Sequence, residues 1–156
     1  MLSQHGITNL ETLMKKLLAV VWLLVLFMSP ATAATSDQTG DIAKAQQIAE
    51  AWLHLLDAGR YGDSWDAASS FWTADHTKEK TARILKEWRE PLGQIQSRTT
   101  LNAEFLVVPD GDCVHLVFAS AFSNKPRHVE TVDMLREADG EWKVASWSQR
   151  ARYRDD

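Results

Sequence analysis

Two side chains in the second half of the chain, His115 and Asp133, are of types that could carry acid–base chemistry. Each lies within a run in which apolar and polar residues alternate, the pattern of a half-buried β-strand. A carboxylate or imidazole held among apolar side chains can have its pKa moved towards neutrality, as a general acid or base requires. Asp133 is also expected opposite Ser146, and a hydrogen bond to that hydroxyl would explain the carboxylate without catalysis.

Two further acidic residues are expected to have structural roles, in which each carboxylate bonds another side chain of the protein. Glu130 lies three residues before Asp133, so alternation places it on the opposite face of the same strand. Asp57 stands near the end of a predicted helix, where the helix dipole disfavours negative charge. We therefore expect Asp57 to bond either the Arg60-Tyr61 corner or Arg98.

Other reactive residue types do not form a recognisable site. The histidines after residue 33 share no metal-ligand spacing, and there is no glycine-rich phosphate loop and no serine-hydrolase motif. The one cysteine, Cys113, cannot form an internal disulfide. Its alternating context predicts a small buried residue, with a reactive thiol beside His115 as the alternative. We predict no metal, no cofactor and no catalytic set.

Tryptophan is the least ordinary feature of the composition. Six of the seven tryptophans follow residue 33, four at helical spacing and two in the last predicted strand. We expect most of them in the core, but an indole offers a large apolar face with one donor, so one or two could line an apolar mouth. The predicted ligand-contacting residues are Tyr61, Trp65, His115, Asp133 and Trp147.

The N-terminus has the organisation of an export signal. A basic pair, Lys15-Lys16, precedes the 12-residue apolar run Leu17–Met28, and Ala31-Thr32-Ala33 fits a cleavage site. That run is shorter than the roughly 20 residues that cross a membrane. We predict cleavage and a bacterial periplasmic or secreted protein without a stable membrane span, an uncleaved anchor being the alternative. Residues 1–13 fit the signal poorly, which makes Met14 an alternative start.

Length and composition predict one folded domain. The chain has 156 residues, 45% hydrophobic and 24% charged, with a net charge of −4. These values are ordinary for a globular protein, and no basic face of the kind that binds nucleic acid is evident. After the signal at 1–33 we predict a polar linker at 34–40 and a single domain at 41–156.

Hydrophobic periodicity divides that domain into helices followed by strands. A helix capped by Asp41 and closed by Gly59 precedes a shorter one over 61–72, and a third follows over 78–90. The pattern then alternates, with turn residues between the runs. We predict an α+β fold in which three N-terminal helices pack on a curved antiparallel meander of four strands, 95–108, 113–122, 128–137 and 141–150.

The strand register follows from the turns. A two-residue turn at Asp139-Gly140 would place Leu135 opposite Val144 and Asp133 opposite Ser146, and a four-residue loop after Phe122 would place Phe118 opposite Thr131. Val129 and Leu135 would then share a face with Phe118, while Val132 and Met134 would take the other. Both faces are half apolar, so the pattern leaves open which one meets the helices.

Two irregularities in the strands are expected. The alternation slips near Asn102-Ala103, as a β-bulge would cause. A second bulge near Ala145-Ser146 would move Trp147 to the same face as Trp142.

Several stretches resemble a bacterial family known as domain of unknown function 4019, which belongs with the nuclear-transport-factor-like and cystatin-like cone folds. They are Trp52-Leu53, Asp57-Ala58-Gly59-Arg60-Tyr61, Ser64-Trp65-Asp66-Ala67-Ala68, Arg89-Glu90-Pro91-Leu92-Gly93, Ser97-Arg98 and Asp139-Gly140 with Trp142 and Val144. The resemblance implies a small exported domain with a cone fold. It implies no reaction, because the family has none assigned.

Three functions fit these observations. The first is a non-catalytic accessory module that binds a small apolar ligand or a protein partner in a shallow cone. The alternative is an acid–base enzyme of isomerase or dehydratase type that uses Asp133 or His115. A third is a homodimer through the exposed side of the sheet. If His115 and Asp133 point into a closed cavity, the enzyme is favoured; if tryptophans fill it, binding is favoured.

Overall fold

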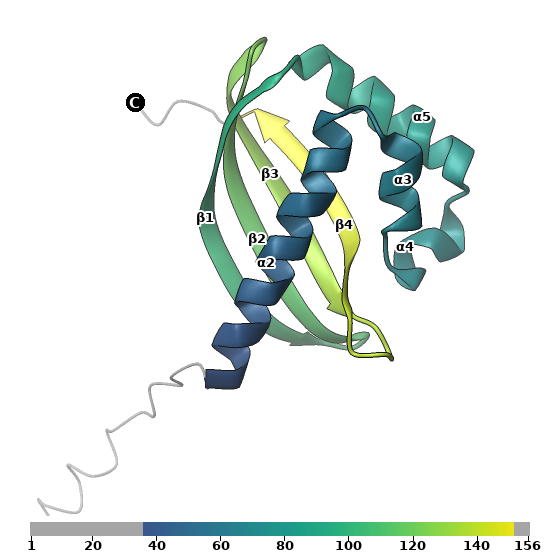
Figure 1. Ribbon diagram of the computed structural model, residues 1–156, viewed down its shortest axis with the longest axis vertical. Coiled ribbons are helices and arrows are strands. Elements are labelled where there is room, and N and C mark those ends of the chain that lie inside the picture. Colours follow the sequence, from purple (N-terminus) through teal and green to yellow (C-terminus); the bar gives the residue numbers. More distant parts are fainter. Residues whose placement is uncertain (1–35, 152–156) are drawn as a thin grey trace, which may run out of the picture. The chain divides into compact units, whose positions relative to one another are not determined.

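The computed structural model describes residues 36–151, which form four α-helices followed by a four-stranded antiparallel sheet that does not close (Figure 1). The predicted α+β class is confirmed. The predicted signal at 1–33 lies outside the described residues. The helices are α2 (Ser36–Asp57), α3 (Tyr61–Asp66), α4 (Ser70–Asp75) and α5 (Lys78–Arg89), followed by the 3-10 turn η1 (Glu90–Leu92). The strands are β1 (Ile95–Val108), β2 (Gly111–Phe122), β3 (Lys125–Arg136) and β4 (Trp142–Ala151).

Helix α2 is longer than the sequence predicts. It begins at Ser36, so residues 36–40 belong to the helix and not to a linker, and Asp41 does not cap it. The Asp41 carboxylate instead pairs with Arg136 of β3. One stripe of α2 is buried against the sheet, as its three-and-four spacing predicts: Ala45, Ala49, Trp52, Leu53 and Leu56.

The second predicted helix is in fact two short helices, α3 and α4. Between them Ala68 forms a bridge with Val144 of β4, and the Ser69 amide donates to the Val144 carbonyl at 2.9 Å. The backbone here is satisfied by the sheet and not by a continuing helix, which is why helical periodicity alone misses the break. The Ser69 hydroxyl then caps α4 by accepting from the Trp72 amide at 3.2 Å. Helix α4 is thereby attached to β4.

The sheet is a meander in the order β1-β2-β3-β4, but its second turn differs from the prediction. Phe122 pairs with Lys125, so the turn has two residues and not four. A further register shift between Ser120 and Phe122 then places Phe118 opposite Glu130 instead of Thr131. A one-residue change of register exchanges the faces of a strand. Val132 and Met134 consequently lie with Phe118 in the core cluster beneath the helices, whereas Leu135 and the buried Val129 lie outside that cluster.

The third turn also differs by one residue. The Glu137 amide donates to the Glu141 carbonyl at 2.8 Å, and Gly140 has a positive φ of 85°, so the loop has three residues, Ala138–Gly140. Leu135 is therefore opposite Lys143 and not Val144.

Both predicted bulges are present. A register shift follows Thr100 in β1, within two residues of the expected place. A second shift at Ala145 restores the predicted pairing of Asp133 with Ser146. It also brings Trp147 to the same face as Trp142, and both are buried.

The helices cover the sheet face that carries Val114, Leu116 and Phe118, called here the inner face. Figure 1 shows α2 running along this face, with α3, α4 and α5 grouped beside β4. The opposite, outer face carries Cys113 and His115. Cys113 is buried, as predicted, and burial and the charge of Asp133 both raise the pKa of its thiol. This raised pKa disfavours a reactive thiolate.

Gly93 and Gly40 are expected to respond to alanine in opposite directions. Gly93 has a φ of 80°, and a Cβ there would collide with Ser123 Oγ. Gly93→Ala should therefore destabilise the fold by about 2–3 kcal/mol through strain and displacement of that hydroxyl. Gly40 is an exposed helical residue, and a Cβ there would meet no atom within 4 Å. Gly40→Ala should stabilise by up to about 1 kcal/mol. The free energies of unfolding of both variants can be measured in urea. Equal changes in the two would contradict the strained, closely packed backbone described here at Gly93.

Candidate functional site

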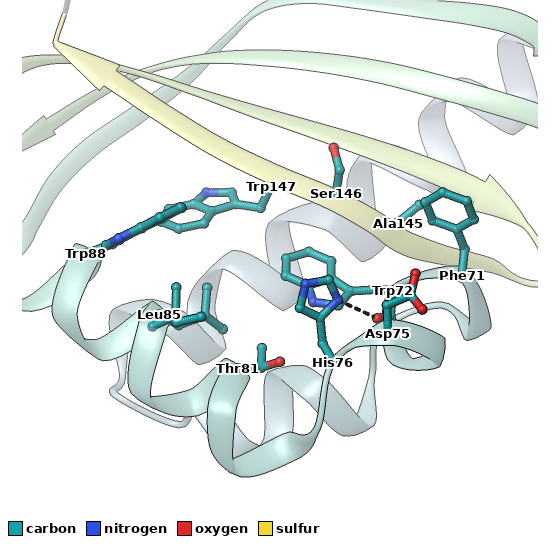
Figure 2. A pocket seen from close by; sticks show the side chains of 11 residues that line it. Phe71, Trp72, Asp75, His76, Thr81, Leu85, Trp88, Ala145, Ser146 and Trp147 are labelled. Carbon is teal, nitrogen blue, oxygen red and sulfur yellow. Dashed lines mark hydrogen bonds between the residues drawn. The ribbon is translucent and has the colours of Figure 1, made fainter.

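A groove of about 310 Å³ opens between α4, α5 and β4 (Figure 2). We call it the aromatic groove. One wall is formed by Phe71 and Trp72 of α4, and the other by Trp88 of α5 and Trp147 of β4. The remaining lining residues are Asp75, His76, Thr81, Ile84, Leu85, Ala145 and Ser146. Figure 2 shows Trp88 and Trp147 together at one end, Phe71 and Asp75 at the other, and His76 beside Trp72 between them.

Two aromatic side chains of the groove are exposed to solvent. Phe71 is 57% exposed and Trp88 is 51% exposed, and in residues 36–151 only Leu101 and Val107 are comparably exposed large apolar residues. Each Å² of apolar surface left in water costs about 25 cal/mol relative to burial. Exposed aromatic rings gathered on a concave surface are typical of binding sites.

The indoles of the groove are held by packing and hydrogen bonds. Trp52 of α2 lies behind them, with ring centroids 5.6 Å from Trp72 and 6.4 Å from Trp147. Trp88 and Trp147 are 6.4 Å apart. The Trp88 carbonyl accepts from Gln149 Nε2 at 3.1 Å. The aromatic walls therefore belong to a packed cluster and are formed before any ligand arrives.

Three polar side chains lie along the groove. His76 Nδ1 is 3.1 Å from the Trp72 carbonyl oxygen. Because that oxygen only accepts, Nδ1 carries a proton, and Nε2 of the neutral ring is an acceptor. Thr81 is 4% exposed, and its hydroxyl has no hydrogen-bond partner in the described part of the chain. Asp75 is exposed and is the only carboxylate among the lining residues.

Behind the Trp147 wall lies a cluster of four charged side chains, called here the buried charge network. Asp57 accepts from Arg89 Nη2 at 2.6 Å and from Arg98 at 2.8 and 3.1 Å. Arg98 Nε also donates to Glu130 at 2.9 Å. Two acids and two bases are thus paired. The predicted contact between Asp57 and Arg98 is confirmed, whereas Arg60 pairs with Asp63 instead.

Glu130 connects this network to the aromatic groove. Its side chain is fully buried, and one oxygen accepts from Arg98 and from Ser120 Oγ at 2.5 Å. The other oxygen accepts from Trp147 Nε1 at 3.4 Å. The indole that forms one wall is thereby oriented by a buried carboxylate.

Arg89 and Arg98 keep Asp57 ionised. Burial raises the pKa of the Asp57 carboxyl, but the hydrogen bonds and charges of Arg98 and Arg89 together outweigh it and leave the pKa lowered below its ordinary value of 3.8. Such a set is neutral overall, and its removal from water is tolerable only because each charge has partners.

The structure separates the five predicted ligand-contacting residues. Trp147 lines the aromatic groove. Tyr61 is buried in the core. Trp65 donates its indole N–H to the His76 carbonyl at 2.7 Å, so it supports the polar end of the groove without lining it. A single cone mouth lined by Tyr61, Trp65, His115 and Trp147 is therefore not formed.

His115 and Asp133 lie together, but on the outer face. His115 Nδ1 is 2.6 Å from one Asp133 oxygen, and Ser146 Oγ donates to the other at 2.5 Å. The side chains of His115 and Asp133 are about one-third exposed. Figure 2 shows the Ser146 side chain on the side of β4 away from the indoles. Since the carboxylate stands between serine and histidine, the imidazole cannot activate the serine. Ligand binding by this pair stays a prediction.

Sequence reasoning missed most of the groove. It recognised Trp72 and Trp88 on helical stripes but expected them mainly in the core. Asp75 and His76 gave no signal, because polar residues at the end of a helix are common. In residues 36–151 no three His, Cys, Asp or Glu side chains gather as a metal site. The helices of this part of the chain include none long and apolar enough to cross a membrane.

Comparisons with known proteins identify the fold. The family described as "Protein of unknown function (DUF4019)" matches residues 48–147, as the sequence resemblance predicts. A solved structure from Catenulispora acidiphila is 18% identical with a TM-score of 0.52, covering 74% of this chain and 94% of that one. A second, from the same organism in complex with S-DNPA, is 18% identical with a TM-score of 0.50, covering 72% and 93%.

A third similar structure is ActVI-ORFA from Streptomyces coelicolor, 14% identical with a TM-score of 0.49, covering 72% of this chain and 97% of that one. No curated protein matches the chain. The family match and the likeness to the two Catenulispora acidiphila structures confirm the predicted cone fold. At these identities the likeness extends to the fold alone.

Removal of the Asp57 charge should destabilise the fold in a pH-dependent way. Asp57→Asn leaves two buried arginines short of an anion, which should cost about 3 kcal/mol at pH 7. Because folding lowers the pKa of Asp57, the wild-type carboxylate stabilises the fold above pH 3.8 and loses this effect as the pH falls through the folded-state pKa. The difference between the two proteins in urea unfolding should therefore shrink below about pH 4.

Asp63→Asn is the matched control. Asp63 pairs with Arg60 at 2.6 Å, but both side chains are exposed, so its removal should cost less than about 1 kcal/mol. Equal losses for the two variants would contradict a structural role for the buried charge network.

Proposed function

The chain belongs to the DUF4019 family of proteins of unknown function, and we propose that it is a non-catalytic binding module whose aromatic groove holds a small, largely apolar ligand. The observation that carries this proposal is the pair of aromatic walls. Phe71 and Trp88 remain exposed on opposite sides of a concavity whose other indoles are packed. A partner that covers both rings would gain the apolar burial that the free protein lacks.

The dimensions and rigidity of the groove support this function. Its volume of about 310 Å³ falls at the lower end of the range for small-molecule sites. The Trp52 contacts and the Ser69 cap hold the walls in place. A ligand would therefore bind without a large ordering cost. A protein of the same fold has been solved in complex with S-DNPA, which supports small-molecule binding here.

The acid–base alternative has less support. It requires His115 and Asp133 in a closed cavity, and both side chains are about one-third exposed on the outer face. Asp133 is already occupied by His115 and Ser146. In the groove, His76 Nδ1 is committed to a backbone carbonyl. Ligand binding without catalysis does not require any of these groups to gain or lose a proton.

We also propose that the module acts outside the cytoplasm. The support is the sequence of residues 1–33, in which a basic pair, a short apolar run and an Ala-x-Ala site follow one another.

Replacement of Trp88 should weaken ligand binding without unfolding the protein. The side chain is half exposed, so Trp88→Ala removes one wall at little cost in stability. With 2-naphthol as a neutral flat probe, isothermal titration calorimetry should show affinity reduced about tenfold, the value of roughly one aromatic contact. Val107→Ala is the control, since Val107 is 78% exposed on β1 and does not line the groove. Equal affinities of the two variants would exclude the groove as the binding site.

Export should remove the first 33 residues. Expression of the full chain in a bacterium and mass spectrometry of the periplasmic fraction should give a mature protein that begins at Ala34. Ala33→Lys should block cleavage, because the site requires a small residue at that position. Recovery of the wild-type chain with residues 1–33 intact in the membrane fraction would show an uncleaved anchor instead.

A further inference from the structure

We propose that the ligand of the aromatic groove is a small organic cation, such as a substituted ammonium compound. This inference rests on the proposed binding function and names the chemical class of the ligand. Three features carry it: the charge of the lining, the faces of the aromatic rings, and the hydrogen-bonding character of the polar side chains.

The charge of the lining favours a cation. Asp75 contributes a carboxylate, and the described residues that line the groove include no lysine or arginine. Lys78, three residues after Asp75, has its ammonium group 2.5 Å from Asp66 Oδ2. An anionic ligand would meet Asp75 without a compensating positive charge. A cation would gain from a carboxylate beside a low-dielectric aromatic surface.

The aromatic rings favour the same charge. The face of an indole is negative, so a cation within about 6 Å of the ring is attracted, and tryptophan is the strongest of the aromatic side chains in this respect. Three tryptophans and Phe71 line this groove. Ligands with alkylated ammonium groups also bury methyl groups against such rings, because their charge is spread and weakly hydrated. An inorganic cation would lose its oxygen ligands there.

The polar side chains can each accept a hydrogen bond from a ligand. His76 uses its Nδ1 proton on the Trp72 carbonyl, which leaves Nε2 as an acceptor in the neutral ring. The Thr81 hydroxyl is buried and has no partner in the described part of the chain, an arrangement that is unfavourable until a partner arrives. Figure 2 shows Thr81 below His76 on the groove floor. A cation that carries an N–H or O–H group would satisfy these side chains.

A matched pair of probes tests the charge directly. Choline and 3,3-dimethyl-1-butanol have nearly the same shape, but only choline is charged. Calorimetry on the mature protein should show choline binding about tenfold more tightly than the neutral alcohol. Asp75→Asn should reduce the affinity for choline about fivefold and leave that for the alcohol unchanged. Asp110→Asn removes the same charge outside the groove and should change neither affinity.

Each outcome has a separate meaning. Equal or tighter binding of the neutral alcohol would overturn the cation assignment while binding by the groove stands. Failure of choline to bind at millimolar concentration would also overturn it, and the proposed binding function would then depend on the 2-naphthol result. A loss of choline affinity in Asp110→Asn equal to that in Asp75→Asn would show a general charge effect and not a site.

Discussion

The buried pairing of Asp57, Arg89, Arg98 and Glu130 is the constraint on which the rest of the structure depends. These side chains come from α2, α5, β1 and β3, and each satisfies at least one of the others. A charge left in a buried position without its partner costs several kcal/mol. Displacing any one of these elements would therefore leave a charged side chain on another element buried without its partner. The pairing is satisfied in one placement of α2 and α5 on the sheet. Placements that shift either helix would separate the charges and cost free energy.

The aromatic groove follows from this placement. Arg89 is the last residue of α5, and Trp88 precedes it, so anchoring Arg89 also positions the exposed indole. The guanidinium group of Arg89 lies 4.2 Å from the Phe122 ring, which fixes it further. Glu130 orients Trp147 from behind. One wall of the groove thus depends on the same carboxylate and guanidinium groups that join helices to sheet.

The other wall depends on β4 itself. Ser69 bonds the Val144 carbonyl at the start of α4, and the bulge at Ala145 follows directly. That bulge lets Val144 and Trp147 both face the helices. The two walls are therefore attached to one strand, and their separation is a property of the fold.

The sequence predicts those parts of the structure that depend on local signals. Strand β1 has the predicted bounds and α5 begins at the predicted residue 78, because alternation and helical periodicity are read over a few residues. The break at Ala68 could not be predicted, since its cause is a bond to a strand far along the chain. The first two hairpin turns are each two residues shorter than predicted, and the third is one residue longer. A one-residue shift in register, whether it comes from a turn or from an irregularity such as the one between Ser120 and Phe122, exchanges the faces of a strand, and composition gives no warning of it.

For the candidate site too, the sequence predicts the features that depend on local signals and misses those that depend on tertiary packing. The predicted bulge near Ala145-Ser146 gives the correct face for Trp147, and the position of Asp57 near a helix end correctly indicates that the carboxylate has a partner. The predicted register places His115 opposite Met134 and on the other face from Asp133, and only the one-residue difference in register between β2 and β3 brings the two side chains together. Trp88 and a core tryptophan have the same helical spacing, and only the position of α5 against β4 distinguishes them.

The most direct test of this account is a map of the tryptophan indole N–H signals by two-dimensional NMR on addition of choline. The account predicts that the signals of Trp72, Trp88 and Trp147 shift together, while that of Trp142, buried beneath Arg136 at the other end of β4, stays in place. Shifts confined to the outer face around His115 and Asp133, with the three indoles unchanged, would contradict it.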